Sequence, residues 1–312
     1  IDYFVYYPRT TGTNGNFGEL EVWIATEENP TYEKYDDYDF GKSGSPSKVE
    51  FNPPLINPKS VKFHVKTGAG NFASCAEMQF YQKNTENVIP DVFADILCSA
   101  LKPEATIEDI EAIGSSFYRN LAKSLYYGNY ATDYRIQTYK PYPHPDVFAA
   151  QNKTNPFSLL DNPTGISAWV DDELIIFVDD LKGEKISLQI INFEDGYGGT
   201  HYPLSSGVNK IKTTNRGLAY IMYHTANPAA ESVKIHIATG TVNGYFDKTK
   251  NTKEEWVTIL NNAEEKHIEI IGEHAHLVFP VRSLKNYCTD GMRLIQIYDS
   301  IVKLEHEFIG LY

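Results

Sequence analysis

The sequence predicts a multi-domain α+β protein that is mostly β with helical inserts. At 312 residues the chain exceeds one ordinary domain, and 42% of it is apolar, which is enough to build large hydrophobic cores. Blocks of strand-like alternation are separated by blocks with helical periodicity. We therefore expect four parts, at residues 1–83, 84–145, 146–238 and 239–312.

The first and third parts each predict a β-sandwich. In the first part, apolar and polar residues alternate, and a turn-forming cluster at residues 11–15 separates the first two runs. These runs occupy residues 1–7, 19–24, 61–66 and 76–81. In the third part the runs are continuously apolar, which is typical of strands buried on both faces. They occupy residues 174–178, 186–190, 217–223 and 233–237.

The second and fourth parts predict helices. Thr106 with Asp109, and Thr252 with Glu255, are capping-box pairs that predict a helix start in each part. In the second part, apolar residues then recur three and four positions apart and form one stripe of packing surface, made of Ile110, Ile113, Phe117, Leu121 and Leu125. A similar stripe in the fourth part needs a partner to cover it, and consists of Leu294, Ile297, Ile301, Leu304 and Phe308. A proline-rich passage at residues 139–145 predicts a connection between domains.

Charge and cysteine content narrow the function classes. The formal net charge of −13 argues against binding to nucleic acid or to anionic membrane surfaces, since both require a basic face. The cysteines Cys75, Cys98 and Cys288 form no even-numbered framework, so hydrophobic packing rather than disulfides must organise the fold. No signal segment or membrane-spanning stretch is present, and because the chain opens at Ile1 we expect it to be part of a longer protein.

Two stretches of the first part resemble the later half of a discoidin-type (coagulation-factor type C) galactose-binding-like module. They are residues 7–15 with the strand that follows, and residues 70–80. In carbohydrate-binding members an arginine, an asparagine five residues later and a late-loop aromatic hold the sugar. The resemblance assigns these roles to Arg9, Asn14 and Phe72. The chemistry fits, because guanidinium and amide groups bind hydroxyls and an aromatic ring accommodates the C–H face of a pyranose.

Each of these residues also has a structural interpretation. Arg9 would form a local salt bridge, Asn14 would shape a turn before Gly15, and Phe72 would belong to the core. The resemblance further places Glu77 where such modules help to hold a structural calcium ion, a hard cation that prefers oxygen ligands. The other ligands of that ion belong to early strands of the module that have no counterpart in this sequence.

A second resemblance extends from residue 101 to residue 312. This portion resembles the enhancin-like, mucin-directed zinc metallopeptidases, the sixtieth metallopeptidase family. It corresponds to the β-rich accessory domain and the beginning of the catalytic domain of that family. The matching landmarks agree in order and spacing, and they lie at residues 161–166, 205–209, 216–221, 244–246, 256 and 298–311.

The resemblance implies a zinc site that this sequence does not complete. Family members carry a His-Glu-x-x-His motif on a helix, in which both histidines bind zinc and the glutamate is the general base. The His-Glu pair of this chain is His306-Glu307, and the position four residues after His306 is Gly310. We therefore expect the motif to lie beyond Tyr312, and we expect this chain to be inactive by itself.

The implied function is a glycan-binding and scaffold region of a secreted or cell-surface bacterial zinc metallopeptidase that cleaves glycoproteins such as mucins. The implied partners are glycans that contain galactose or N-acetylgalactosamine. Two alternatives stay open. One is a surface carbohydrate-binding protein without an enzymatic parent, and the other is the accessory region of a glycoside hydrolase, since discoidin-type modules often accompany such enzymes.

Two further clusters have metal-ligating residue types. His274 and His276 are spaced to lie on one face of a strand, where they either bind a metal or are ordinary surface or core histidines. The acidic residues 171–173 and 179–180 flank a predicted buried strand. They either bind calcium or form polar turns that keep the strand ends soluble.

Overall fold

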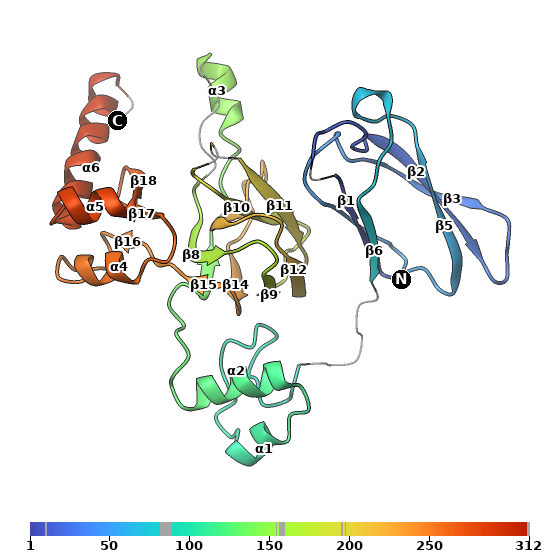
Figure 1. Cartoon of the computed structure of the whole chain (residues 1–312), viewed down its shortest axis with the longest axis horizontal. Helices are drawn as coiled ribbons and strands as arrows, with labels where there is room; N and C mark the ends of the chain where they lie inside the picture. The colour runs from blue at the N-terminus through green and yellow to red at the C-terminus, as the bar shows by residue number, and fades with distance from the viewer. Residues whose placement is uncertain are drawn as a thin grey trace. The chain divides into compact units, whose positions relative to one another are not determined.

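The computed structural model of the chain describes residues 1–9, 11–81, 89–153, 155, 160–194, 196 and 198–310. It comprises two compact units, Ile1–Pro90 with Thr200–Pro203, and Asp91–Gly199 with Leu204–Tyr312 (Figure 1). The predicted fold class, mostly β with helical inserts, is confirmed. The predicted boundary between residues 83 and 84 lies outside the described residues, and the four-part division remains a prediction.

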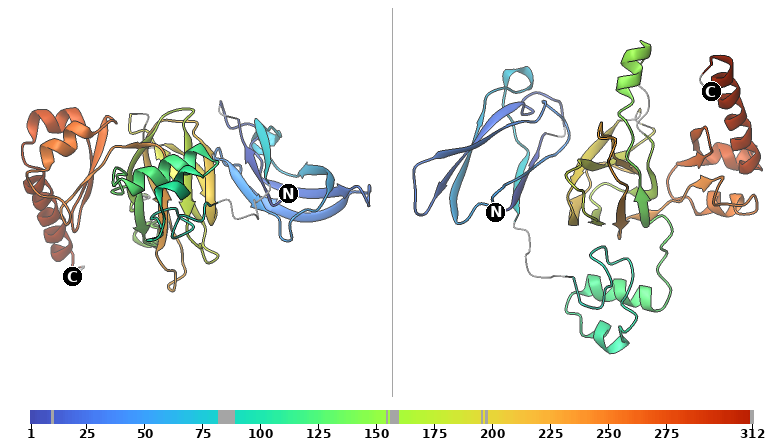
Figure 2. Two further views of the ribbon diagram at one scale, coloured as in Figure 1. Left: turned by 90° about the horizontal axis from the view of Figure 1, so that it is seen from below. Right: turned by 180° about the vertical axis from the view of Figure 1, so that it is seen from behind.

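Over its described residues, the first unit is a sandwich of two three-stranded antiparallel sheets, at the blue end of the colour scale in Figures 1 and 2. One sheet has the order β4-β1-β6 and the other the order β3-β2-β5. The elements are β1 (Tyr3–Tyr7), β2 (Glu19–Thr26), β3 (Glu33–Asp39), β4 (Ser47–Glu50), β5 (Pro58–Val65), the short 3-10 turn η1 (Ala69–Asn71) and β6 (Glu77–Tyr81).

Side-chain alternation places the apolar residues of this unit between the two sheets. Phe4 and Tyr6 of β1 are buried there together with Leu20 and Val22 of β2. The ring of Tyr6 stacks on that of Phe17, with ring centroids 4.3 Å apart. The strands predicted in this part, which correspond to β1, β2, β5 and β6, are confirmed.

The sequence did not predict β3 and β4. Strand β3 carries charged residues at most of its positions and lacks an apolar alternation. It lies at the edge of its sheet, where charged side chains prevent pairing with other chains. Its backbone hydrogen bonds to β2 hold it in the sheet.

The second unit is built around a second sandwich, as the sequence predicted (Figures 1 and 2). The sandwich also includes residues 136–139, which lie in the part predicted to be helical with a proline-rich connection. A sheet of order β11-β10-β13-β8-β15 forms one layer and a sheet of order β12-β9-β14-β7 forms the other. The strands are β7 (Ile136–Tyr139), β8 (Pro163–Ala168), β9 (Glu173–Val178), β10 (Ile186–Ile191), β11 (Gly199–Leu204), β12 (Gly207–Lys212), β13 (Gly217–Met222), β14 (Val233–Ile237) and β15 (Thr241–Val242).

Strand β13 shows why the sequence of this part is continuously apolar. All six of its residues are buried. Leu218, Tyr220 and Met222 pack on one face in a cluster with Ile191. By alternation the other face of β13 points into the sandwich. The cluster is covered by the following α+β segment, because the buried Glu269 of that segment faces Tyr220.

The helical segment before β7 differs in one respect from the prediction. The capping box of Thr106 and Asp109 is present, with both reciprocal bonds, and starts the first helix. The apolar stripe, however, spans two helices rather than one, because the helix is interrupted around Gly114 and the second helix begins after Ser115. The helices of this region are α1 (Ile107–Glu111), α2 (Ser116–Tyr126) and, after β7, α3 (Asp146–Asn152).

The last segment is an α+β layer with a core of its own. Strand β16 pairs in parallel with β17, which pairs antiparallel with β18. The helices pack on this sheet around Trp256, whose ring meets that of Phe246 edge-on at 5.2 Å. The elements are β16 (Phe246–Asp247), α4 (Trp256–Asn262), β17 (His267–Ile271), β18 (His276–Pro280), α5 (Val281–Tyr287) and α6 (Gly291–Phe308).

Helix α6 is the helix predicted after Asp290, whose side chain accepts a hydrogen bond from the backbone N–H of Arg293. The apolar stripe predicted on this helix is largely exposed: Leu294 is half-buried, whereas Ile297, Ile301, Leu304 and Phe308 are exposed. The residue of α6 that enters the core is Ile295, beside the stripe. Within the described part of the chain, no helix combines the length and the apolarity needed to cross a membrane.

Candidate functional site

Two loops of the first unit contain the residues that the sequence assigned to sugar binding. The loop after β1 and the loop after β5 are joined by backbone hydrogen bonds. The N–H of Gly15 donates to Ala69 O (2.8 Å), that of Ser74 to Gly15 O (2.8 Å) and that of Ala69 to Asn16 O (2.9 Å). Gly15 has a φ of +92°, and a Cβ there would lie 2.4 Å from Ser74 Oγ. The glycine of the motif, Gly15, is therefore a structural requirement of this junction.

The structure brings Asn14 and Phe72 together. Both flank Gly70, which has a φ of +65°. A Cβ on Gly70 would lie 2.8 Å from Asn14 Oδ1 and 3.4 Å from Phe72 Cδ2. Phe72 is 65% exposed, which excludes the alternative of a core residue. An exposed aromatic ring thus lies beside an exposed amide on a rigid loop pair.

Arg9 lies on the same loop as Asn14 and is exposed. Its Nη2 donates to the carbonyl oxygen of Thr11 at 3.2 Å. Among the described residues no carboxylate pairs with it, so the alternative of a local salt bridge finds no support. The guanidinium is held by one neutral acceptor and keeps other donors for a ligand. Thr10, which belongs to the same motif, lies outside the described residues.

Sequence reasoning missed two residues beneath these loops. The hydroxyl of the buried Tyr6 donates to Ser74 O (2.9 Å) and accepts from the N–H of Phe17 (3.3 Å), so it ties both loops to the sandwich. Burial raises the pKa of Tyr6, which keeps the hydroxyl a donor. Asn16 is also buried, and its side-chain amide has no hydrogen-bond partner within the part of the chain that the structure describes.

The remaining predicted site residue, Glu77, lies at the start of β6 and is exposed. Its Oε1 accepts a hydrogen bond from Gln79 Nε2 at 2.9 Å. Nowhere in the described residues do three or more His, Cys, Asp or Glu side chains gather as a metal-binding group. The calcium role of Glu77 remains a prediction.

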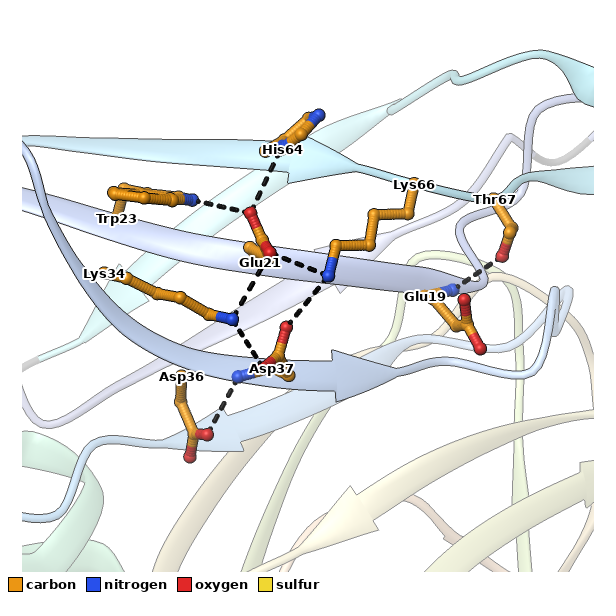
Figure 3. A network of polar contacts seen from close by, with 9 residues as sticks. All are labelled: Glu19, Glu21, Trp23, Lys34, Asp36, Asp37, His64, Lys66 and Thr67. Atoms are coloured by element: carbon orange, nitrogen blue, oxygen red, sulfur yellow. Dashed lines mark hydrogen bonds and ion pairs between the residues drawn. The ribbon is translucent and has the colours of Figure 1, made fainter.

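The outer face of the sheet β3-β2-β5 carries a polar network around Glu21 (Figure 3). The carboxylate of Glu21 contacts Lys66 Nζ (2.7 Å), Trp23 Nε1 (3.0 Å), His64 Nδ1 (3.1 Å) and Lys34 Nζ (3.3 Å). Lys66 first, and then His64 and Trp23, hold the pKa of Glu21 well below its usual range. These contacts cross-link the three strands, so the network stiffens the sheet that supports the loops.

The histidines and acidic residues predicted as possible metal ligands in the second unit form no metal-binding group among the described residues. His276 begins β18, but His274 lies in the preceding turn, where its backbone N–H donates to Asp299 Oδ1 at 2.8 Å. The predicted common strand face for the two imidazoles is therefore wrong. The acidic turn at residues 171–173 is used locally: Asp171 pairs with Lys212, and Asp172 Oδ2 accepts from the N–H of Trp169 at 2.8 Å.

The His306-Glu307 pair lies at the end of α6. The helix ends at Phe308, and Gly310 has a φ of +75°. The backbone thus leaves the helical path before the position where a second histidine would bind zinc together with His306. The described residues do not fit a zinc ion at this place.

Comparison with known proteins identifies relatives of this fold. Residues 240–312 match the family described as peptidase M60, enhancin and enhancin-like. A solved metallopeptidase from Bacteroides thetaiotaomicron is 31% identical, with a TM-score of 0.67, over 75% of this chain and 42% of that chain. A metallopeptidase solved in complex with Tn antigen is 33% identical, with a TM-score of 0.55, over 59% of this chain and 36% of that chain.

A third structure has a fold that matches almost the whole chain. It contains the CBM32-1, CBM32-2 and M60 catalytic domains of Clostridium perfringens ZmpB. It covers 99% of this chain and 36% of that chain, with a TM-score of 0.55 and 18% identity, a level that shows the fold alone. No curated protein sequence matches the chain.

The chain spans less than half the length of each of these structures. The family match falls on the α+β segment from β15 to α6, the part that the sequence resemblance identified as the beginning of a catalytic domain. That resemblance is confirmed: the chain carries, at residues 240–312, a region of the peptidase M60, enhancin and enhancin-like family.

Proposed function

We propose that this chain is the glycan-binding and scaffold region of a secreted, bacterial zinc metallopeptidase that acts on glycoproteins such as mucins. The family match and the metallopeptidase relatives support the peptidase parent. The relative bound to Tn antigen supports a glycan-bearing substrate. In this proposal the first unit binds the glycan and thereby raises the local concentration of the substrate for the peptidase.

The observation that carries the glycan-binding role is the exposed ring of Phe72 beside Asn14 on two interlocked loops. A pyranose needs an apolar face to stack on and fixed polar groups for its hydroxyls, and a rigid loop pair supplies both with little ordering cost. Arg9 adds donors from the same loop. We expect the bound sugar to be galactose or N-acetylgalactosamine.

No hydrolytic step can be assigned to the described residues of this chain. Zinc, when bound in the parent protein, supplies a Lewis acid and an activated water, but His306 has no second histidine in the described helix. We therefore expect the 312-residue chain to show no zinc-dependent cleavage of a mucin-type glycopeptide. Peptide hydrolysis that disappears with a chelator and returns with zinc would contradict this assignment.

Calorimetric titration of N-acetylgalactosamine into the purified chain tests the glycan role. We expect saturable binding that Arg9→Ala and Phe72→Ala each weaken roughly tenfold, the scale of a lost charged hydrogen bond or stacking contact. The matched controls are Lys59→Ala and Ile56→Ala, which remove an exposed cation and an exposed apolar side chain from the same unit. Equal affinities in all variants would place the sugar elsewhere, and no saturable signal would refute glycan binding.

A further inference from the structure

A second exposed aromatic platform lies in the second unit, at the turn between β8 and β9. Trp169 directly follows β8 and is 42% exposed, so part of it is open to solvent. In the β8–β13 ladder Ala168 pairs with Gly217, so the next positions outward, Trp169 and Arg216, lie opposite one another. The guanidinium of Arg216 accordingly lies 4.5 Å from the ring centroid of Trp169.

Arg216 is held in place by a buried carboxylate. Its Nη2 lies 3.2 Å from Oε2 of Glu265, a residue that is only 6% exposed. This contact fixes the guanidinium, and the guanidinium in turn fixes the indole by the attraction between a cation and an aromatic ring. The exposed part of Trp169 is therefore supported by a preorganised pair, Arg216 and Glu265, which come from separate loops.

Two polar atoms of the pair under Trp169 are enclosed by the protein. Nε of Arg216 and Oε1 of Glu265 are both buried and have no hydrogen-bond partner among the residues that the structure describes. Glu194 and Lys266 lie nearby and pair at 2.6 Å. Lys266 first, and Arg216 after it, lower the pKa of Glu194.

This combination of groups selects among possible ligands. An apolar protein surface placed on Trp169 would desolvate the exposed charged groups beside it, Glu194 and Lys266. A nucleic acid is disfavoured by the net charge of −13. A sugar ring suits this surface, because its C–H face stacks on the indole while its hydroxyls keep the exposed charged groups beside it hydrogen-bonded.

We propose that Trp169, backed by Arg216 and Glu265, is a second carbohydrate subsite that stacks a hexopyranose ring of a glycan chain. The inference rests on the proposed glycan-binding function and extends it from the first unit to the second. A glycoprotein that carries several sugar chains then engages the protein at two places, so its binding is stronger than at either site alone.

The three tryptophans of the chain provide a direct test by NMR. The indole N–H of Trp23 donates to Glu21 and that of Trp256 to Cys288 O, so both are held within the protein. We expect titration with N-acetylgalactosamine or methyl β-galactoside to shift the Trp169 indole signal saturably while the Trp256 signal stays in place. The shift should persist in the Arg9→Ala/Phe72→Ala double variant, which removes the first site.

Trp169→Ala should abolish the binding that remains in that double variant. Arg216→Lys keeps the charge but loses the planar stack, so we expect roughly three- to tenfold weaker binding at this subsite. Tyr287→Ala, which removes an aromatic ring that is 87% exposed, is the matched control and should leave the affinity unchanged. Unaltered Trp23 and Trp256 signals verify that each variant is folded.

The outcomes separate the two proposals. A stationary Trp169 signal, together with binding that is lost completely in the Arg9→Ala/Phe72→Ala variant, overturns the second subsite and leaves the first site intact. No saturable binding by the wild-type chain to either sugar refutes the glycan function itself. Trp169 shifts that saturate in the double variant and vanish with Trp169→Ala support the inference.

Discussion

The buried carboxyl of Glu269 predicts a specific pH dependence of stability. Glu269 lies in the middle of β17, is fully buried, and faces Tyr220 of the sandwich. Neither carboxyl oxygen has a hydrogen-bond partner among the described residues, and the same holds for the hydroxyl of Tyr220. Burial raises the pKa of Glu269 from 4.5 to about 7, because the charged form loses its hydration.

The sign and size of the effect follow from this shift. In the unfolded chain Glu269 loses its proton near its ordinary pKa, whereas the folded protein retains the proton up to about pH 7. The folded state is therefore favoured at low pH, and this contribution is lost as pH rises between the two pKa values. Since one pKa unit corresponds to about 1.4 kcal/mol, the full loss is roughly 3 kcal/mol.

Glu269→Gln removes the titration and keeps the size of the side chain. We expect the free energy of unfolding of the variant, relative to wild type, to increase by about 2 to 3 kcal/mol between pH 5 and pH 8. Urea denaturation followed by the fluorescence of Trp256, which is buried in the same α+β segment, measures this difference. The matched control is Glu264→Gln at an exposed position nearby. Parallel pH profiles for wild type and Glu269→Gln would refute the reasoning.

Three further predictions concern packing, a buried ion pair and the sugar site. Gly291→Ala places a Cβ about 2.2 Å from Cε3 of the buried Trp256. The overpacking should lower the free energy of unfolding, measured by thermal or urea denaturation, by about 1–3 kcal/mol. A change within experimental error would show that the start of the helix adjusts freely. Asp299→Ala leaves Lys248 and two turn N–H groups without their acceptor and should destabilise the protein by about 3 kcal/mol at neutral pH. Burial alone would raise the pKa of Asp299, but hydrogen bonds from Lys248 and the turn lower it below its ordinary value. The stabilisation by Asp299 is therefore present above the ordinary carboxyl pKa and should fade as pH falls through the depressed pKa of the folded state. An unchanged cost of Asp299→Ala under strongly acidic conditions would contradict this. Gly70→Ala places a Cβ against the side chain of Asn14 at a position with a φ of +65°. It should therefore weaken sugar binding while the melting temperature falls by only a few degrees. Unchanged affinity would show that Asn14 does not contact the sugar.

Local sequence patterns predicted many of the strands and helices, because periodicity and capping depend on neighbouring residues. The capping box at Thr106 and the stripe of α6 both became helices, and the apolar run of β13 became a buried strand. The charged strand β3 was missed, since an edge strand is held by its ladder and needs no apolar alternation. The break near Gly114 was also missed, because an apolar stripe continues across two helices that share one packing face.

The sequence by itself determined the fold class, the family resemblance of residues 240–312, and a set of sugar-binding candidates in Arg9, Asn14 and Phe72. Only the tertiary structure decided that Phe72 is exposed beside Asn14, because that contact joins loops far apart in the chain through the bonds around Gly15. The Trp169 platform likewise depends on strand register, which places a tryptophan opposite an arginine that lies on a different hairpin. Residue patterns encode neighbours along the chain, whereas burial and cross-strand contacts arise when distant segments pack.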